Sequence, residues 1–464
     1  MRFQPRVTEI VAESGSSSLF EDLYTRLSHR SGCIALDSAG GNPRRYSLIA
    51  FDPLGGLELP RGIADLRAYA EELRPIAADD VPGPFHGGFL GALAYDLGVV
   101  GESAVRVSRE PWGSPLVAGG LYVDFVVLDE RERRAWLVLG EDPGDGRADL
   151  ATRRAELDAS LRGPAQILVP ARADGPVRRA SAPGVHRARI EDLRQRIAAG
   201  DLYQANLAHR LECGLTGDPR ELYLRLRRVN PAPYMGWLAW DPSTSTGGAP
   251  GTRGALLSAS PELLLEFDGT TARTRPIKGT APRGADPETD AANAARLLAS
   301  AKDLAELAMI VDLERNDLGA CARPGGVRVE AFPRLETYAT VHHLVADVAA
   351  EVRPGVGAFE LLARLFPGGS ITGAPKLAAM DAIADLEREG RGFFTGSMGF
   401  VDTRGHAAWN ILIRTLVWRP LEGLRGEVSF HVGGGITWSS DAEAEERETA
   451  YKGAGLSRAL DEES

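Results

Sequence analysis

Apolar residues recur along the chain at spacings that predict both helices and strands. After Ser18, whose hydroxyl can cap a helix, apolar side chains return every three or four residues as far as Leu27, the spacing of one helical face. Similar spacing, or a capping Asp-Pro pair, predicts further helices at about 147–161, 190–200 and 302–313 and from Asp218 onward. Short apolar runs bounded by turn residues predict strands at 33–37, 46–51, 121–128, 135–139, 234–240, 255–260 and 428–432.

Two of these strand pairs are predicted to form hairpins. The strand at 33–37 would pair with 46–51 across the turn Gly40-Gly41-Asn42-Pro43. The strand at 121–128 would pair with 135–139 around a charged turn. Both hairpins fall in the N-terminal third of the chain.

One stretch of the chain lacks this periodicity. Residues 164–185 are rich in Pro, Ala, Gly and Arg, the composition of a connection between compact regions. We therefore expect an N-terminal region over 1–163, a linker over 164–185 and a C-terminal region over 186–460. Residues 241–254, which are full of Ser, Thr and Gly, are expected to form a surface loop.

Composition and charge narrow the classes of function. The chain has 464 residues, 44% hydrophobic and 25% charged, as in an ordinary globular protein. Its net charge of −11 argues against nucleic acid or an anionic membrane as a partner. No apolar run approaches the roughly 20 residues of a membrane span, and residues 1–5 contain no apolar signal-peptide core. Cys33, Cys213 and Cys321 are far apart and odd in number, which favours a reducing compartment and a cytoplasmic location.

The most informative stretch runs from Thr274 to Gly284 and reads Thr-Arg-Pro-Ile-Lys-Gly-Thr-Ala-Pro-Arg-Gly. Its prolines fix φ and its glycines permit close backbone approach, so Lys278 is held with little freedom. A lysine among apolar neighbours loses hydration, which lowers its pKa and frees its lone pair for nucleophilic attack. Taken alone, the pattern more often belongs to a lysine whose stem packs while its ammonium reaches water.

The chain around Lys278 resembles the chorismate-utilising enzymes, and the resemblance extends over nearly all of its length. Shortly before Lys278, the segment Ser-Ala-Ser-Pro-Glu ends at Glu262, and both residues belong to one strand–turn–strand unit. Anthranilate synthase component I typically carries Pro-Ile-Ala-Gly-Thr, whereas aminodeoxychorismate synthase component I carries Pro-Ile-Lys-Gly-Thr. This chain has the lysine. Residues 368–372, Gly-Gly-Ser-Ile-Thr, resemble the second group as well.

The resemblance implies an α+β fold in which two large antiparallel sheets pack as a sandwich with outer helices and chorismate binds between the N- and C-terminal parts. It also implies that Lys278 attacks C2 of chorismate, that Glu262 is the general acid for the departing 4-hydroxyl, and that His343 takes part in the site. The residues alone say less about His343. It lies in a strand-like run beside His342, so the two rings face opposite sides, and a core histidine is the default interpretation.

Two acidic helical segments are candidates for a metal site. The segment 302–313 is apolar almost all round, so Glu306 would be buried and would need a cationic partner. In the second segment, which we expect Ser440 to cap, Glu445 and Glu448 share a helix face at i,i+3. A solvated acidic helix start explains that spacing equally well. The resemblance implies that Glu306 and Glu448 hold a Mg²⁺ that binds a substrate carboxylate, with Glu445 close by.

Other residues are candidates for binding the substrate. Arg414 lies on a predicted apolar strand, where either a substrate carboxylate or a structural salt bridge would satisfy it. The glycines at 433–435 would end a strand and form either an anion-binding nest or a plain bend. The resemblance implies that the turn at 367–376 contacts the substrate, and it places an aromatic residue near the substrate at position 394. The predicted substrate-binding residues are Arg414, Thr372, Lys376, Phe394, Gly433, Gly434 and Gly435.

Together these features predict 4-amination of chorismate, the activity of aminodeoxychorismate synthase component I, on the route to 4-aminobenzoate and folate with Mg²⁺ as cofactor. None of the three cysteines lies in a Gly-x-Cys-x-Gly elbow, so ammonia is expected from a separate glutamine amidotransferase subunit. The main alternative is anthranilate synthase component I, and isochorismate synthase is a weaker one. A non-catalytic alternative is a chorismate-binding or regulatory subunit, although every catalytic and metal position of the family is filled.

Overall fold

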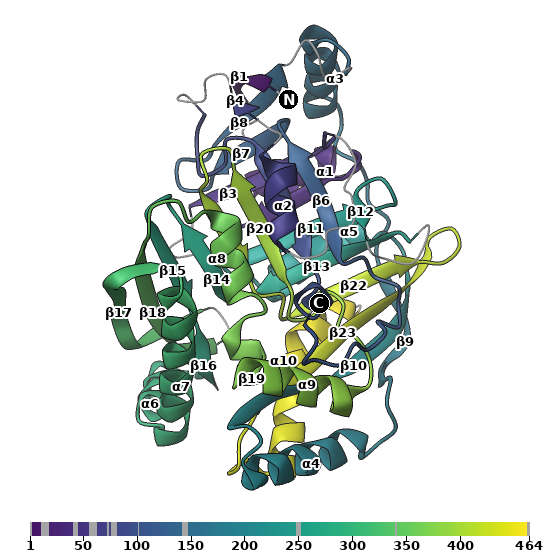
Figure 1. Ribbon diagram of the computed structural model, residues 1–464. Helices are drawn as coiled ribbons and strands as arrows, with labels where there is room; N and C mark the ends of the chain where they lie inside the picture. The colour runs from purple at the N-terminus through teal and green to yellow at the C-terminus, as the bar shows by residue number, and fades with distance from the viewer. Residues whose placement is uncertain are drawn as a thin grey trace.

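The computed structural model of this protein describes residues 2–10, 18–39, 45–54, 63–71, 74–75, 81–100, 102–141, 147–246, 252–338 and 341–461. In these residues the chain forms two large β-sheets with helices on their outer surfaces (Figure 1). The predicted α+β fold with two antiparallel sheets is confirmed.

The first sheet contains 13 strands within the described residues. Its pairings are antiparallel except for the short parallel contact between β1 and β4. In spatial order its strands are β19 (Gly373–Ala374), β10 (Gln204–Thr216), β23 (Arg425–Ile436), β22 (Thr415–Pro420), β13 (Gly254–Ser260), β11 (Tyr234–Trp240), β2 (Ile34–Asp37), β3 (Tyr46–Ala50), β7 (Phe125–Asp129), β8 (Arg134–Glu141), β1 (Arg2–Ile10) and β4 (Arg74–Pro75), with β9 (Arg172–Arg179) paired to β10.

The second sheet contains ten strands within the described residues, and its pairings are antiparallel. In spatial order they are β12 (Ser245–Thr246), β6 (Val117–Tyr122), β5 (Gly88–Leu93), β20 (Ser397–Asp402), β21 (Ala407–Asn410), β14 (Leu263–Phe267), β15 (Thr271–Arg275), β18 (Val341–Val352) and β16 (Ile277–Pro282), with β17 (Ala322–Thr337) paired to β18.

Helices cover the outer faces of both sheets (Figure 1). The first sheet is covered by α1 (Leu19–Leu27), α3 (Leu150–Arg162), α5 (Pro219–Val229) and α10 (Ala442–Leu460), with α4 (Val185–Ala199) and α9 (Lys376–Glu387) on its β10 end. The second sheet contacts α6 (Pro287–Leu298), α7 (Ala301–Gly319) and α8 (Ala358–Leu365), and α2 (Ile63–Ala70) packs on α8. Two short 3₁₀ helices are η1 (Tyr95–Gly98) and η2 (Gly369–Ile371).

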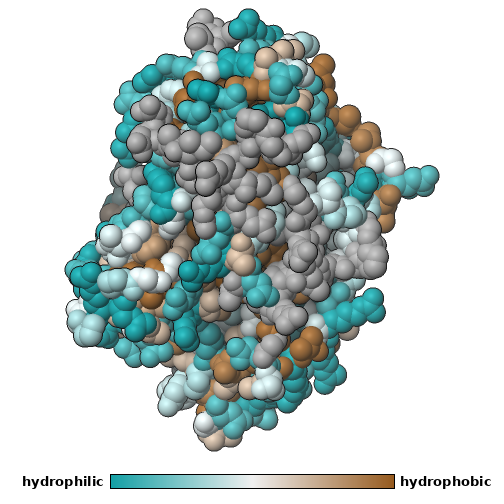
Figure 2. Space-filling view, turned by 45° about the horizontal axis from the view of Figure 1, so that its top comes forward, coloured by the Kyte–Doolittle hydropathy of each residue, from teal (hydrophilic) through white to brown (hydrophobic). Residues whose placement is uncertain are grey.

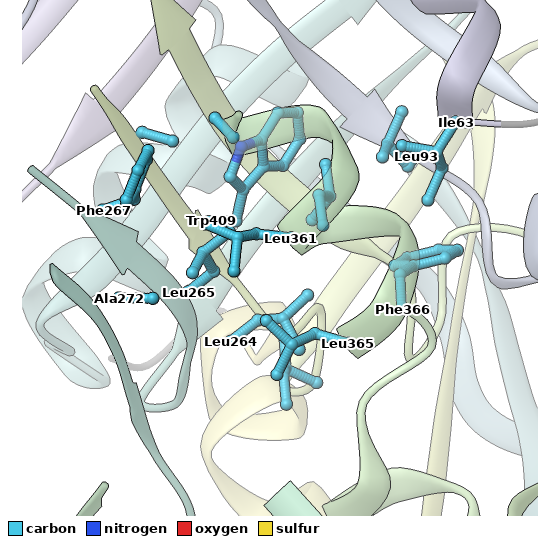
Figure 3. Close-up of a cluster of buried hydrophobic side chains, with 14 of the residues drawn as sticks. Ile63, Leu93, Leu264, Leu265, Phe267, Ala272, Leu361, Leu365, Phe366 and Trp409 are labelled. Carbon is cyan, nitrogen blue, oxygen red and sulfur yellow. The ribbon is translucent and has the colours of Figure 1, made fainter. Parts of the chain in front are cut away.

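The hydrophobic core lies in layers between these elements. Strand residues of both sheets, such as Phe125 on β7 and Phe400 on β20, pack together between the sheets. A second layer lies under α2 and α8, where Trp409 is fully buried (Figure 3). Because each large apolar side chain contributes roughly 1.5–3 kcal/mol when buried, these layers hold the two sheets and the outer helices in one arrangement.

Local capping signals agree with the structure in part. The Ser18 hydroxyl accepts a hydrogen bond from the Glu21 N–H at the start of α1, and Asp218 caps α5. The predicted cap of α10 is wrong, because Asp441 and not Ser440 accepts from the Ala444 N–H. The prediction that 302–313 is buried all round is also wrong. Helix α7 is amphipathic, and residues such as Ala305 and Asp312 are exposed.

The predicted strand at 121–128 is in fact two strands in different sheets. Strand β6 ends at Tyr122 in the second sheet and β7 begins at Phe125 in the first, so the chain crosses between sheets at Asp124. The buried carboxylate of Asp124 accepts from the Gly140 N–H and pairs with Arg153, which stabilises the crossing. The hairpin of β7 with β8 and the pairing of β2 with β3 are confirmed, while the predicted turn at 40–43 lies outside the described residues.

The predicted linker contains regular structure. Strand β9 lies within 164–185 and pairs with β10, because the side of β10 beside it would otherwise leave backbone groups unpaired. Residues from both sides of this segment also pair with one another, β11 with β2 and β20 with β5. The N- and C-terminal regions therefore share both sheets. The predicted surface loop at 241–254 includes β12, which pairs with β6, and its residues 247–251 lie outside the described part.

The face of the molecule shown in Figure 2 is mostly hydrophilic where its residues are described, and hydrophobic residues appear there in small separate groups. Scattered apolar residues are normal on the surface of a globular protein. Among the described helices, none has the length and apolar character needed to cross a membrane.

Candidate active site

Lys278 projects from β16 at a bulge in its pairing with β18. The bulge falls at Gly279, whose φ of +81° favours glycine. The Lys278 Nζ donates a hydrogen bond to the carbonyl oxygen of Ser370 at 3.1 Å. Burial lowers the pKa of Lys278, although the charges of Glu306 and Glu262 act in the opposite direction. This direction agrees with an amine that can become a nucleophile.

Glu262 lies between β13 and β14 and is only 3% exposed. Its Oε1 accepts a hydrogen bond from the backbone N–H of Ile277 at 3.3 Å, which places the carboxyl group beside the residue that precedes Lys278. Burial raises the pKa of Glu262, while the charges of Lys278 and Arg414 partly oppose that effect. A carboxyl group that keeps its proton to higher pH is suited to act as a general acid.

His343 on β18 is buried and bridges two polar side chains. Its Nδ1 lies 2.9 Å from the Thr280 hydroxyl, and its Nε2 lies 3.3 Å from an Arg414 NH2 nitrogen. Because a guanidinium can only donate, Nε2 must be the acceptor and the ring proton must sit on Nδ1. Burial, helped by the Arg414 charge, lowers the pKa of His343 to about 3, so the ring is neutral. His342 faces the other side and contacts Asp290 at 2.9 Å.

Arg414 is not on a strand, contrary to the prediction. It lies between β21 and β22 with a φ of +52°, a left-handed conformation that turns its side chain toward His343. Within the described residues it forms no ion pair with a carboxylate. Its guanidinium therefore keeps donors free for an anionic ligand, and a structural salt bridge does not account for it.

The three predicted metal ligands lie near two lysines. Lys302 Nζ is 3.8 Å from Glu306 Oε1 and 3.6 Å from Glu445 Oε1, so one ammonium lies between two carboxylates. Glu445 also accepts from the Ser440 hydroxyl at 2.8 Å. Burial raises the pKa of Glu306. For Glu448, burial acts in the same direction, but the charge and hydrogen bond of Lys452, at 2.8 Å, together with the charges of Lys302 and Lys278, outweigh it and lower the pKa.

This donor set suits a hard cation in its chemistry, because carboxylate oxygens are the ligands that Mg²⁺ prefers. The ammonium of Lys302 shows that Glu306 and Glu445 can share one cation. However, in the described part of the chain no three Asp, Glu, His or Cys side chains are grouped closely enough to hold a metal ion. The magnesium site therefore stays a prediction.

The glycines at 433–435 do not form a nest. They continue strand β23, which pairs with β10 as far as Ile436, and none of them has a positive φ. Because these glycines have no Cβ, they leave space for neighbouring polar side chains. A Cβ on Gly434 would lie 3.2 Å from Lys452 Nζ, and a Cβ on Gly435 would lie 2.6 Å from Gln204 Nε2 and 3.5 Å from Lys278 Nζ.

Gln204 is a residue of this centre that the sequence patterns did not single out. It is fully buried at the start of β10, and neither its amide oxygen nor its amide nitrogen has a hydrogen-bond partner in the described structure. The position that a Gly435 Cβ would occupy is close to both Gln204 and Lys278. An unpaired buried amide is costly, so Gln204 presents a donor and an acceptor to a ligand beside Lys278. The signal that could have found it is the segment 201–207, Asp-Leu-Tyr-Gln-Ala-Asn-Leu, which resembles a segment of the chorismate-utilising enzymes.

Three other predicted substrate-binding residues have protein partners. The Thr372 hydroxyl is buried and donates to the Gly368 carbonyl at 2.8 Å. The ammonium of Lys376 contacts Asp317 at 2.7 Å, so it is engaged at the end of α7. The ring of Phe394 stacks on His431 with centroids 4.7 Å apart. The structure thus groups Lys278, Glu262, His343 and Arg414, and it gives Lys376 and Phe394 contacts outside that group.

Comparisons with known proteins identify relatives of this chain. The family described as "chorismate binding enzyme" matches residues 43–458. Anthranilate synthase component 1 of Streptomyces coelicolor is 37% identical over 437 residues, which is 90% of this chain and 81% of that protein. Aminodeoxychorismate synthase component 1 of Escherichia coli is 35% identical over 382 residues, 82% and 78% of the two chains. Its Bacillus subtilis counterpart is 32% identical over 463 residues, 95% and 94% of the two chains.

Solved structures show the same fold. The crystal structure of anthranilate synthase component I from Streptococcus pneumoniae has a TM-score of 0.75 at 28% identity and covers 90% of this chain and 93% of that chain. MenF, the menaquinone-specific isochorismate synthase of Escherichia coli, has a TM-score of 0.74 at 17% identity and covers 98% and 94% of the two chains. At that identity MenF supports the fold alone.

Proposed function

This chain belongs to the chorismate binding enzyme family, and we propose that it is the chorismate-converting component of an aminodeoxychorismate synthase. It would convert chorismate and ammonia to 4-amino-4-deoxychorismate, the precursor of 4-aminobenzoate. The observation that carries this proposal is the amine of Lys278, held 3.1 Å from the Ser370 carbonyl in the same buried centre as Glu262. A chain that aminates at C2 directly needs no amine nucleophile at this position.

The proposed chemistry has two displacements. In the first, the Lys278 amine forms a bond to C2, both ring double bonds shift by one position, and the C4–O bond breaks as Glu262 gives its proton to the departing hydroxyl, which leaves as water. In the second, ammonia forms a bond to C4, both double bonds return to their original positions, and the bond from C2 to Lys278 breaks. The proton lost from ammonia restores Glu262. One water is released for each ammonia added, and the enolpyruvyl group is kept.

Side chains of the centre would orient the substrate and the ammonia. Arg414 has free donors for a substrate carboxylate, and its contact with His343 orients the guanidinium. The unpaired amide of Gln204 offers both a donor and an acceptor beside Lys278, which suits a small group such as ammonia. Burial of this centre excludes water, a competing nucleophile.

We propose that Glu306 and Glu448 hold a Mg²⁺, with Glu445 close by. When bound, the ion would neutralise and orient a substrate carboxylate. Without the ion, Lys302 and Lys452 pair with these carboxylates and balance two of their three negative charges.

Ammonia would come from a separate glutamine amidotransferase subunit. A glutaminase needs a reactive cysteine, and a reactive cysteine needs a low thiol pKa and access to substrate. Here Cys33, Cys213 and Cys321 are buried. Burial raises the pKa of Cys33 to about 12 and that of Cys213 to about 11, and it also raises the pKa of Cys321.

The alternative product is anthranilate. Relatives named anthranilate synthase component 1 match this chain at an identity similar to that of the aminodeoxychorismate synthases. The two activities differ in where ammonia is added, at C2 or at C4, and in whether pyruvate is lost. Lys278 and the residues 368–372 favour C4, since both resemble the aminodeoxychorismate synthases.

Product analysis tests the proposal. The protein is incubated with chorismate, an ammonium salt and Mg²⁺, and the products are separated by chromatography with mass detection. The expected product is 4-amino-4-deoxychorismate with no pyruvate. Anthranilate with pyruvate would establish the alternative, and isochorismate would indicate an enzyme that adds water, rather than ammonia, to C2 as the 4-hydroxyl leaves. A heat-inactivated sample controls for the spontaneous decay of chorismate.

A further inference from the structure

A buried ion pair lies behind the turn that carries Ser370, and no step proposed above uses it. Arg391 is 3% exposed and Glu387, the last residue of α9, is 5% exposed. Arg391 Nε lies 2.9 Å from one Glu387 carboxylate oxygen, and an Arg391 NH2 nitrogen lies 2.7 Å from the other. The pair is therefore bidentate, the geometry that fixes a guanidinium most firmly.

The remaining donors of Arg391 hold backbone near the catalytic centre. One terminal nitrogen donates to the Ile371 carbonyl and to the Thr395 hydroxyl, both at 3.2 Å. The other donates to the Asn206 carbonyl at 2.6 Å. All five N–H groups of the guanidinium thus have acceptors. Ile371 directly follows Ser370, whose carbonyl accepts the hydrogen bond from Lys278.

Asn206, on β10, is hydrogen-bonded to Thr372, the last residue of the same turn. Its backbone N–H donates to the Thr372 carbonyl at 2.8 Å, while its own carbonyl accepts from Arg391. Glu387 in turn accepts from the Ala208 N–H at 2.8 Å. The turn 369–372 is thereby tied to β10 through one guanidinium and one carboxylate.

Residues of the N-terminal region support this pair. The carboxylate of Asp96, on η1, accepts from the backbone N–H groups of Arg391 at 3.2 Å and of Gly392 at 2.8 Å. The ring of Tyr95 lies under the guanidinium at 4.9 Å. Gly98 packs against Pro367, just before the turn, because a Cβ on Gly98 would lie 2.6 Å from Pro367 Cδ. Helix η1 therefore contacts both Arg391 and the residue Pro367 that leads into the turn 369–372.

We propose that Arg391, with Glu387 and Asp96, is a positioning residue for the reaction. These residues set the turn 369–372 so that the Ser370 carbonyl holds the Lys278 amine in line for attack, and they link η1 of the N-terminal region to the nucleophile. The inference rests on the proposed function, in which Lys278 is that nucleophile. We call Arg391, Glu387 and Asp96 the clamp.

A purely structural role is the competing explanation, since breaking any buried ion pair destabilises the fold by leaving a buried charge without its partner. The two explanations differ in what a folded variant does. A lysine at 391 keeps the positive charge but cannot reach five acceptors with a planar fork. If the clamp only stabilises the fold, a folded Arg391→Lys variant keeps its turnover number.

The test compares Arg391→Lys with a matched control, Arg225→Lys. Arg225 is also a buried arginine, 7% exposed, paired at i,i+4 with Glu221 and bound to a backbone carbonyl, but on α5. Four quantities are measured for each folded variant: the melting temperature, kcat and KM for chorismate consumption, and the rate at which cyanate carbamylates Lys278. The carbamylation is followed by peptide mass mapping in the absence of substrate.

We expect Arg391→Lys to lower kcat by about 10–100-fold, the effect of displacing a reacting group by about 1 Å, with KM for chorismate within about twofold. The carbamylation rate of Lys278 should change at least severalfold. The melting temperature of the Arg225→Lys control should fall by an amount similar to that of Arg391→Lys. Its kcat and its Lys278 carbamylation rate should equal those of wild type.

Asp96→Asn provides a second variant that preserves the size of the side chain, in case Arg391→Lys does not fold. It should shift kcat and the carbamylation rate in the same direction by a smaller factor, about 3–10-fold, because one of two backbone contacts is retained. Wild-type kcat and carbamylation in a folded clamp variant, or equal losses in the Arg225→Lys control, would overturn the inference. Carbamylation involves no turnover, so it tests the clamp even if the product proves to be anthranilate.

Discussion

Two neighbouring regions contact the turn 369–372, and they differ in whether their buried polar groups have hydrogen-bond or ion-pair partners. In the clamp, every N–H group of the Arg391 guanidinium has an acceptor. In the centre around Lys278, the amide of Gln204 has no partner and Arg414 forms no ion pair within the described residues. Buried polar groups are normally paired. We therefore infer a structural or positioning role for the paired groups of the clamp, and a ligand-binding role for Gln204 and Arg414 beside Lys278.

This difference predicts how the two regions respond to substitution. Changes at the centre should alter the reaction and leave stability nearly unchanged, because the lost groups made few internal contacts. Changes in the clamp should reduce both. The predictions below test this difference, beginning with the largest expected effect.

In Lys278→Ala, the rate of 4-amino-4-deoxychorismate formation should fall by roughly 10³-fold or more, because removing a nucleophile has effects on that scale. With C2 now open to ammonia, some 2-amino product should form. Product chromatography measures both, and intact mass spectrometry of wild type with chorismate but no ammonia should show an adduct at Lys278. A variant that still makes the 4-amino product at near the wild-type rate, with no adduct in wild type, would refute the nucleophile assignment.

Glu306→Gln and Glu448→Gln should each lower the ammonia-dependent rate about 10²-fold or more, since the proposed Mg²⁺ would lose a carboxylate ligand. Both proteins should stay folded because, among the described residues, the ion pairs of these two carboxylates are those with Lys302 and Lys452. Titration of wild type and variants with Mg²⁺, beside a chelator control, decides the point. Full activity in excess chelator would exclude the metal.

Glu262→Gln should lower kcat about 10²–10⁴-fold with little change in KM for chorismate, because general acid catalysis acts in the transition state. The pKa of Glu262 is raised by burial, so its acid form persists above the ordinary carboxyl range. Wild-type kcat should therefore fall as pH rises through the folded pKa, and the variant should lack this dependence. A defect confined to KM would instead make Glu262 a binding residue.

Arg414→Met should raise KM for chorismate by about 10–100-fold, the worth of a hydrogen bond to a charged group, while the melting temperature stays level or rises. Arg391→Met is the matched comparison, and it should lower the melting temperature because Glu387 is left buried without its partner. Thermal unfolding and initial-rate kinetics of both variants test these two expectations. A large loss of stability in Arg414→Met would contradict the distinction between the two regions.

Glu314 gives the smallest predicted effect. It is 2% exposed on α7, its Oε2 accepts from the Thr274 hydroxyl at 2.8 Å, and burial raises its pKa well above the ordinary carboxyl value. A carboxyl with a raised folded pKa stabilises the protein at low pH, and this contribution is lost as pH rises above the unfolded pKa of about 4.3. Glu314→Gln should therefore gain roughly 1–3 °C in melting temperature over wild type at pH 8, and little at pH 4. Equal differences at both pH values would show that Glu314 does not titrate in this way.

Several features followed from the sequence because their causes are local. Ser18 and Asp218 each cap the helix that begins at the next residue. Lys278 is confined by the prolines and glycines beside it. The sequence also predicted a lowered pKa for Lys278, and burial does lower it. The apolar runs also located β2, β3 and β8 and part of β7, since a short apolar run between turn residues predicts a buried strand.

Other features required the tertiary structure because they depend on residues far apart in the chain. The division of 121–128 between two sheets depends on Asp124 and its partner Arg153. Whether 433–435 bend or stay extended depends on β10, which continues to pair with them. The clamp joins Asp96 to Gly392, and the centre brings Gln204 close to Lys278. No local periodicity encodes such contacts, so the sequence by itself indicated the family and Lys278 as the candidate nucleophile, and only packing decided which buried polar groups have protein partners and which do not.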